Sequence, residues 1–202
     1  AMKGRVYITL GVDEPVSVLD AATGELIHEL PGSKGAEEII VEGGQVFVLE
    51  SPEEWELNSF LPFHNTGDQA RIRRDFAWNK KKRDVKAYDS VTGKRIWGHN
   101  NKVAPLTMTA DEHRVFFHDG EKVVALNRSS GDVAWSAGKS FLPETVRFNF
   151  GPKLVIHDGV VLYAGGDRTM KAIDAKTGKQ LWEAPHARGG YQSPEDLLVM
   201  RG

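Results

Sequence analysis

The side chains best equipped to bind a ligand lie in three stretches that separate apolar runs of the sequence. These candidates are His99, Asn100 and Lys102, then Arg147 and Asn149, then His186, Arg188, Tyr191 and Gln192. Cationic, imidazole, amide and aromatic groups together can hold a polar or anionic molecule. Taken singly, each of them is expected to have a solvated or turn-stabilising role, and binding is the alternative. We expect the three stretches to form one candidate binding face.

A second candidate surface is a charged insertion at residues 51–82. Its first part carries three acidic residues at positions 53, 54 and 56. Its second part is mainly basic and includes Arg71, Arg73, Arg74 and Trp78. Bases interleaved with aromatics can bind nucleic acid, but the near-balance of charge favours two halves that face each other as a lid or docking flap. Loops of this length within a compact domain are commonly functional or disordered.

Composition narrows the classes of function. The 202 residues carry a formal net charge of −2, so no global field would recruit nucleic acid or an anionic membrane. The sequence contains no cysteine, which excludes disulfides, thiolate metal sites and cysteine nucleophiles. No apolar run is long enough for a transmembrane segment. His118-Asp119-Gly120 and His157-Asp158-Gly159 could be taken for metal ligands, but each stands where a tight turn is expected, and we predict no metal site.

The elements that must position these residues are indicated by an internal repeat. Four ten-residue segments align without gaps, at residues 19–28, 88–97, 126–135 and 173–182. Their consensus is an apolar residue, Asp or Asn, two variable residues, Thr or Ser, Gly, two variable residues, an apolar residue and Trp. Glycine enters the left-handed backbone region cheaply, and the Asp and Thr side chains can bond the backbone of the same turn. Each segment is therefore predicted to be a hairpin turn.

Strand-like runs around each turn give the fold class. In the fourth repeat they are 153–156, 160–164, 170–175 and 179–182, which predict a four-stranded antiparallel meander. Successive turn glycines at 93, 131 and 178 are 38 and 47 residues apart, and four strands per roughly 40 residues is typical of a β-propeller blade. The chain is predicted to be all-β, a single partial propeller domain over 1–202 of about four blades. Residues 51–82 would separate the second and third strands of the second blade.

The first and last predicted strands occupy different positions within the four-stranded repeat. The run 6–9 aligns with a second strand, whereas 196–200 aligns with an inner strand, giving sixteen predicted strands. An unpaired sheet edge must find a partner. The last strand could complete the first blade of a four-bladed ring, or two chains could exchange edges. We favour part of a larger ring that closes by self-association.

The turn segments, preceded by runs such as Val161 to Asp167, resemble the pyrroloquinoline-quinone-like β-propeller repeat of the quinoprotein alcohol dehydrogenase-like proteins. The resemblance covers nearly all of the chain outside residues 51–82. It implies that Trp97, Trp135 and Trp182 are structural wedges between neighbouring blades, with His28 as a replacement in the first repeat. It also implies a periplasmic or secreted location.

Members of this family include both quinone enzymes and noncatalytic scaffolds. The enzymes hold calcium and pyrroloquinoline quinone, with an Asp base, an Arg and often adjacent cysteines, and no segment here matches those motifs. We therefore expect no cofactor, no catalytic residue, and a noncatalytic module that presents its loop face and insertion to a protein or polymeric ligand. The alternative is part of a quinone-dependent dehydrogenase with quinone and calcium. A weaker alternative is a carbohydrate-binding or carbohydrate-acting module.

Overall fold

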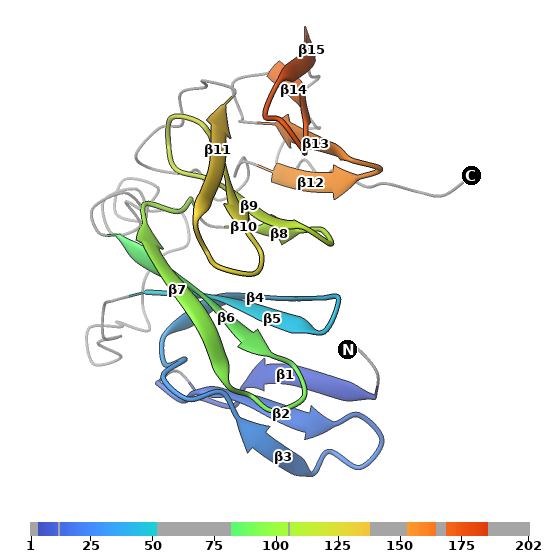
Figure 1. The fold of residues 1–202 in the computed structure, drawn as a ribbon. Coiled ribbons are helices and arrows are strands. Elements are labelled where there is room, and N and C mark those ends of the chain that lie inside the picture. The colour runs from blue at the N-terminus through green and yellow to red at the C-terminus, as the bar shows by residue number, and fades with distance from the viewer. Residues whose placement is uncertain are drawn as a thin grey trace, which may run out of the picture. The chain divides into compact units, whose positions relative to one another are not determined.

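The computed structural model describes residues 4–11, 13–51, 82–104, 106–137, 153–164 and 169–185, and these ranges contain strands and turns without a helix. The strands form four antiparallel sheets, each built from strands that follow one another in the chain (Figure 1). The first sheet has β1 (Arg5–Thr9), β2 (Val16–Asp20) and β3 (Leu26–Glu29). The second has β4 (Ala36–Glu42), β5 (Gln45–Glu50), β6 (Arg83–Asp89) and β7 (Arg95–Asn101).

The other two sheets are also meanders. The third has β8 (Thr109–Ala110), β9 (Arg114–His118), β10 (Val123–Asn127) and β11 (Val133–Ala137). The fourth has β12 (Lys153–His157), β13 (Val160–Ala164), β14 (Thr169–Asp174) and β15 (Gln180–Pro185). The all-β prediction is confirmed, as is the prediction of three strands in the first sheet and four in each of the next three. The expected last strand at 196–200 lies outside the described residues.

The chain divides into two compact units, each containing two sheets. Among the described residues, one unit contains 4–11, 13–51, 82–101 and 128–131, and the other contains 102–104, 106–127, 132–137, 153–164 and 169–185. The core of the first includes Val16, Val18, Leu30, Val46, Val48 and Tyr88. The core of the second includes Phe116, Val123, Leu154, Val161, Tyr163 and Ile173. The assignment of 1–202 to a single domain stays a prediction.

The turns predicted from the repeat form as expected, and their own polar groups hold them. Asp89 Oδ1 accepts hydrogen bonds from the Val91 amide at 3.0 Å, the Thr92 amide at 2.7 Å and the Thr92 hydroxyl at 2.9 Å. Gly93 takes the left-handed conformation, with φ of 69°, and its amide donates to the Asp89 carbonyl. The Asp and Thr side chains of the first and fourth turns make the corresponding bonds. The consensus residues thus specify the hairpins locally.

One strand differs from the sequence prediction. The run Leu106 to Thr109 predicts the first strand of the third sheet, but β8 contains only Thr109 and Ala110. The Thr107 hydroxyl, not a strand ladder, accepts the His118 amide at 3.1 Å, and Thr107 is fully buried. A side-chain hydroxyl in place of a backbone acceptor lets the chain leave the extended conformation, since the buried amide is still satisfied.

Candidate binding face

At one end of the second sheet lie the ends of all four strands that are nearest to the insertion, and this end is called the β4–β7 edge. The register pairs Ala36 with Glu50, Glu50 with Asp84, and Asp84 with Asn100. The start of β4, the end of β5, the start of β6 and the end of β7 therefore share an edge. The chain leaves this edge at the end of β5, Glu50, and returns to it at the start of β6, Arg83, while the insertion at 51–82 stays a prediction. Residues 52–81 themselves are outside the described ranges.

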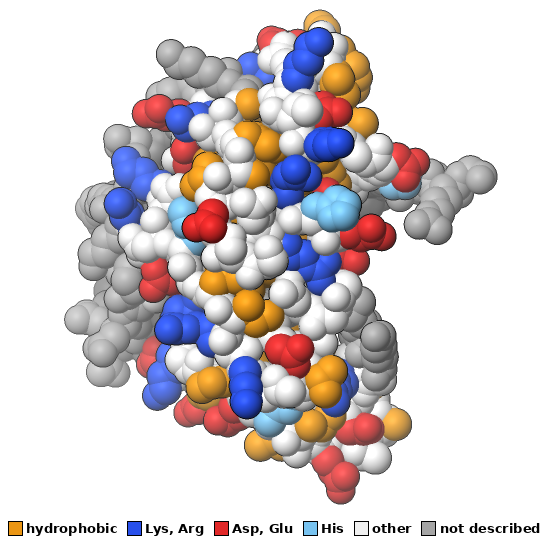
Figure 2. Space-filling model, in the orientation of Figure 1, with side chains coloured by type: hydrophobic (Ala, Val, Ile, Leu, Met, Phe, Trp, Pro, Cys, Tyr) orange, Lys and Arg blue, Asp and Glu red, His pale blue; other side chains and the backbone are white. Residues whose placement is uncertain are grey.

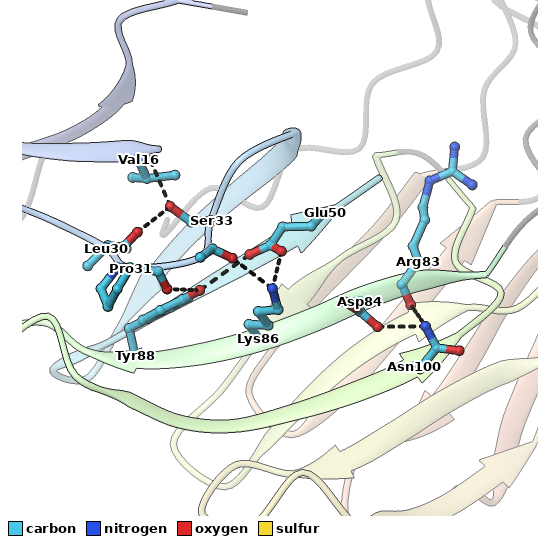
Figure 3. A network of polar contacts seen from close by, with 11 residues as sticks. Val16, Leu30, Pro31, Ser33, Glu50, Arg83, Asp84, Lys86, Tyr88 and Asn100 are labelled. Carbon is cyan, nitrogen blue, oxygen red and sulfur yellow. Dashed lines mark hydrogen bonds and ion pairs between the residues drawn. The ribbon is translucent and has the colours of Figure 1, made fainter. Parts of the chain in front are cut away.

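Three polar contacts join strands at this edge, and Figure 3 shows two of them, Lys86 with Glu50 and Asn100 with Asp84. Arg83 Nε donates to Glu37 Oε2 at 2.5 Å, and Arg83 Nη2 donates to Glu37 Oε1 at 3.3 Å. Lys86 Nζ forms an ion pair with Glu50 Oε2. Asn100 Nδ2 donates to Asp84 Oδ1 at 2.6 Å. Acids and bases at the edge thus compensate each other, which fixes the strand ends from which the insertion departs.

The contact between Glu50 and Lys86 continues to the buried Tyr88 and to the link between β3 and β4, residues 30–35. Glu50 is 5% exposed and Tyr88 is fully buried. The Tyr88 hydroxyl lies 3.3 Å from both Glu50 Oε1 and the Pro31 carbonyl, and Lys86 Nζ also donates to the Gly32 carbonyl at 2.7 Å. Figure 3 shows these groups converging between β5, β6 and the link. A buried carboxylate with an ammonium partner and a phenol donor is a satisfied structural group.

The electrostatics of this cluster follow from its burial. Desolvation raises the pKa of the Glu50 carboxyl above its ordinary value, and the hydrogen bond and charge of Lys86 oppose that shift. Burial also raises the pKa of the Tyr88 hydroxyl, and the neighbouring Glu50 carboxylate adds to the effect. Tyr88 is consequently a neutral hydrogen-bond donor at physiological pH. The arrangement positions the sheet edge and offers no activated base.

Two of the sequence-predicted candidates belong to a strand and not to a loop. His99 and Asn100 lie in β7, paired with Val85 and Asp84 of β6, because the ladder continues to the Arg83–Asn101 pair. Because β6 begins at Arg83, its first three residues pair with residues 99–101, a polar segment that the sequence alone indicates as a link. The amide of Asn100 is used in the contact with Asp84, whereas Lys102 is exposed just beyond β7. His99, Asn100 and Lys102 are thus brought to the same edge as the insertion.

The remaining candidates cannot be placed at this edge. Arg147, Asn149, His186, Arg188, Tyr191 and Gln192 lie outside the described residues, as do Arg71, Arg73, Arg74 and Trp78 of the insertion. Conversely, sequence reasoning missed Glu37, Glu50, Lys86 and Tyr88. A signal was present, because Glu50 and Arg83 are the charged residues nearest to the two ends of the insertion.

The two His-Asp-Gly segments are turns. His118 is fully buried, its Nδ1 accepts the Gly120 amide at 3.0 Å, and its ring stacks on Tyr163 with centroids 4.4 Å apart. Asp119 Oδ1 accepts the amides of Glu121 and Lys122. At the other segment, Asp158 and Gly159 both have positive φ, as a two-residue hairpin turn requires. Within the described ranges, no three acidic or histidine side chains gather as a metal-binding group.

Comparison with known proteins identifies the family. A family model described as outer membrane protein assembly factor BamB matches residues 81–199, more than half of the chain. The chain belongs to this family. Its four sheets are propeller blades of the pyrroloquinoline-quinone-like type, which confirms the predicted fold and resemblance.

Proteins similar to this BamB-family chain include an assembly factor and, by fold alone, an alcohol dehydrogenase. Outer membrane protein assembly factor BamB of Burkholderia pseudomallei strain K96243 is 27% identical over 132 residues, which cover 58% of this chain and 34% of the relative. The chain thus matches about a third of the length of that relative. The crystal structure of BamB from Moraxella catarrhalis matches at 16% identity with a TM-score of 0.56, covering 91% of this chain and 50% of the other.

A quinohemoprotein alcohol dehydrogenase from Comamonas testosteroni has the same fold, at 16% identity and a TM-score of 0.59, covering 92% of this chain and 34% of the enzyme. Three carboxylates at the β4–β7 edge of the BamB-family chain already have side-chain partners and are not open calcium ligands. Glu37, Glu50 and Asp84 are each engaged by a neighbouring side chain. A calcium ion needs six or more oxygen ligands. No helix in the described part of the chain is long and apolar enough to cross a membrane.

Proposed function

We propose that this chain is a noncatalytic, protein-binding propeller module in outer membrane protein assembly, and that it binds its partner at the β4–β7 edge and the insertion. Membership of the BamB family supports the proposal. The proposed process, outer membrane protein assembly, is taken from the name of the Burkholderia relative. The proposed location is the periplasm, the compartment that adjoins the outer membrane. The protein needs no cofactor for this role.

The observation that carries the proposal is the pairing of charges at the two ends of the insertion. Arg83, just after it, is held by Glu37, while Glu50, just before it, is held by Lys86. Preorganised ends present a loop at lower entropic cost than free ends, since less ordering is left for the binding step. Catalysis would instead call for a titratable group with a perturbed pKa that faces a ligand. The pKa of Glu50 is raised, but its carboxyl contacts Lys86 and Tyr88 and not a ligand.

Charge on the visible surface agrees with a protein partner. Figure 2 shows Lys and Arg side chains beside Asp and Glu side chains over the face in view, with apolar side chains between them. A surface of mixed sign suits a complementary protein surface, whereas nucleic acid and anionic lipid select a run of positive charge.

Site-specific photo-crosslinking tests the binding edge. Lys102 lies at this edge, and Lys94 lies in the turn at the opposite edge of the same sheet; both are exposed. Each is replaced in turn by p-benzoylphenylalanine, and the chain is directed to the periplasm of a Burkholderia host. We expect light to join the Lys102→p-benzoylphenylalanine chain to one outer membrane assembly protein, identified by mass spectrometry, and the Lys94 variant to give no such product.

Equal crosslinking from the two positions, or none from either, contradicts the proposed edge. A dye-linked alcohol oxidation assay after addition of pyrroloquinoline quinone and calcium tests the enzymatic alternative separately. Turnover in that assay would overturn the noncatalytic role, whatever the crosslinking shows.

A further inference from the structure

Two tryptophans of the repeat cover a glycine turn of another repeat in the same way. The glycine turns are 20–24, 89–93, 127–131 and 174–178, and the tenth residue of each repeat is His28, Trp97, Trp135 or Trp182. Trp97 lies against Gly131 so closely that a Cβ built there would be 2.6 Å from Trp97 Cε3. The indole Nε1 donates to the Arg128 carbonyl of the same turn at 2.7 Å.

Trp135 repeats this arrangement at the last turn. A Cβ at Gly178 would be 2.8 Å from Trp135 Cδ2, and the indole Nε1 donates to the Ala175 carbonyl at 3.0 Å. In both cases the acceptor is the carbonyl of the third residue before the glycine. An indole donates one hydrogen bond and does not titrate, so neither covering ring changes its charge with pH. Trp182 is instead 45% exposed among the described residues.

At the 89–93 turn the covering ring is the imidazole of His28. A Cβ at Gly93 would be 2.6 Å from His28 Cδ2 and 2.9 Å from His28 Nε2, so this edge of the ring lies against the turn. Nε2 is buried and has no hydrogen-bond partner among the described residues. A buried nitrogen without a partner costs less as the lone pair of a neutral ring than as an N–H of a charged ring. The turn therefore suits the neutral imidazole.

The carbonyl that the indoles bond in the other turns already has two donors at this one. The third residue before Gly93 is Ser90, and its carbonyl accepts Arg5 Nη1 at 2.5 Å and the Tyr7 hydroxyl at 3.2 Å. Arg5 and Tyr7 belong to β1, so the first sheet holds this turn through both of them as well as through His28. A carbonyl oxygen has two lone pairs, and both are used here. All of these residues lie in one compact unit.

The charges around His28 also oppose a second cation. Burial lowers the pKa of the His28 imidazole below its ordinary value, and the positive charge of Arg5 lowers it further. The acid of the covered turn, Asp89, uses its Oδ1 to accept the Val91 and Thr92 amides. The other charged residues next to this contact, none of which bonds His28 Nε2, are Asp20, Glu25, Glu29, Lys94 and Arg95.

We propose that the contact between the first sheet and the 89–93 turn is a pH-sensitive joint, closed by neutral His28 and loosened when this imidazole gains a proton in mild acid. The charged ring would bring a second cation beside Arg5. Its Nε2–H would have to displace Arg5 or Tyr7 from the Ser90 carbonyl, or leave the turn. Either movement removes contacts that join the two sheets. Histidine titrates near neutral pH, so a modest acidification suffices.

The direction of the pH effect follows from the two protonation states. Because the folded joint disfavours the charged imidazole, the unfolded chain binds this proton more readily, with a pKa of about 6.5. The stability of the joint is therefore complete above that pH and decreases as pH falls below it. Glu50 has the opposite effect, since burial raises its pKa and the folded state binds its proton more readily. The wild-type chain is for this reason compared with a variant at each pH.

Urea unfolding of the whole chain at two pH values tests the joint. Between pH 7.5 and pH 5.5, we expect the unfolding constant of the wild-type chain to rise by up to about tenfold more than that of His28→Gln, which has no imidazole to protonate. His113→Gln is the matched control, because His113 is an exposed histidine in a turn of the third sheet. This variant should keep the full wild-type dependence on pH.

Arg5→Met separates the electrostatic effect from a general loss of packing. The variant should be less stable than wild type at both pH values, because it removes a hydrogen bond to the Ser90 carbonyl. Its dependence on pH should nevertheless be smaller, because the neighbouring cation and the competing donor are both removed.

Nuclear magnetic resonance of the wild-type chain gives an answer that needs no variant to fold. We expect the His28 ring to titrate at a pH below the unfolded-state value of about 6.5, and the amide signals of Ser90 and Gly93 to shift with the same midpoint. A midpoint at or above the unfolded-state value would overturn the proposal. Equal dependence on pH in wild type and His28→Gln would overturn it as well, because the proton that matters would then bind elsewhere.

Discussion

Leu106 holds the left-handed backbone conformation that Gly32 holds in another link between sheets: φ is 58° at Leu106 and 73° at Gly32. In both links the following hydroxyl donates to a carbonyl three residues earlier, Ser33 to Leu30 and Thr107 to Ala104, each at 2.7 Å. The same hydroxyls accept the buried amides of Val16 and His118. The two links have the same hydroxyl hydrogen bonds. Only the first link has a glycine, Gly32, at the position with positive φ.

Leu106→Gly should therefore stabilise the protein. A non-glycine residue in the left-handed region costs about 1–2 kcal/mol, offset in part by the greater freedom of glycine in the unfolded chain. Leu106 is 60% exposed, so little packing is lost. We expect a gain of about 1 kcal/mol, or roughly 2–4 °C in Tm. Leu10→Gly, at a residue that is 64% exposed and has no positive φ, should instead lower the Tm.

Gly131→Ala should destabilise the protein more than Gly32→Ala does. Both glycines have positive φ, near 75°, so both substitutions carry the same backbone cost. Only at Gly131 would the new Cβ meet an indole, at 2.6 Å, and overpacking of this kind adds about 1–3 kcal/mol. Urea unfolding of the two variants measures the difference directly. Equal losses of unfolding free energy would show that the Trp97 contact yields without cost.

Removal of one member of the Lys86–Glu50 pair should cost more than removal of both. The side chains are only 15% and 7% exposed, so Glu50→Ala leaves a largely desolvated ammonium without its carboxylate. We expect Glu50→Ala to lower the unfolding free energy by about 3 kcal/mol, and the Glu50→Met, Lys86→Met double variant to stay within about 1 kcal/mol of wild type. Chemical denaturation of the single and double variants tests this, and additive losses would contradict it.

Asp89 should make the protein sensitive to acid. Hydrogen bonds from the Thr92 amide and hydroxyl hold the pKa of Asp89 below its ordinary value. A carboxyl with a lowered folded-state pKa contributes stability that is present above the unfolded-state pKa of about 3.9 and is lost as pH falls through the folded-state value.

Asp89→Asn isolates that contribution, because Asn127 already occupies the same place in the third repeat. The stability difference between wild type and Asp89→Asn should shrink as pH falls below about 3.9. Thermal unfolding between pH 7 and pH 3 measures it. A difference that stays constant over this range would mean that the turn does not distinguish the two protonation states.

The sequence predicts the features whose partners are close in the chain. The Asp89 turn is one: the bonds made by the Asp89 side chain and by the Asp89 and Gly93 amides join residues at most five apart, so the ten-residue pattern contains them, although the Ser90 amide also donates to the distant Gly44 carbonyl. The short β8 escaped prediction because the hydroxyl of Thr107 replaces ladder bonds with an amide eleven residues away. The Glu50–Lys86 pair escaped because its members lie 36 residues apart, on either side of the insertion. Exposure of Trp182 depends on what lies against it, which its own repeat does not encode.

The locality of the four turns has a kinetic consequence. All-β chains usually fold slowly, because strands that are distant in the chain must come together, at a cost in chain entropy, before they form stabilising contacts. Here the hydrogen bonds made by the Asp20 side chain and by the Asp20 and Gly24 amides span at most five residues, so closure of this glycine turn requires only a short loop, and the bond from the Ala21 amide to the Gly4 carbonyl can follow. We expect such hairpins to form within microseconds, ahead of the sheets they belong to. A nascent polypeptide could then assemble its blades one after another as it emerges from the ribosome.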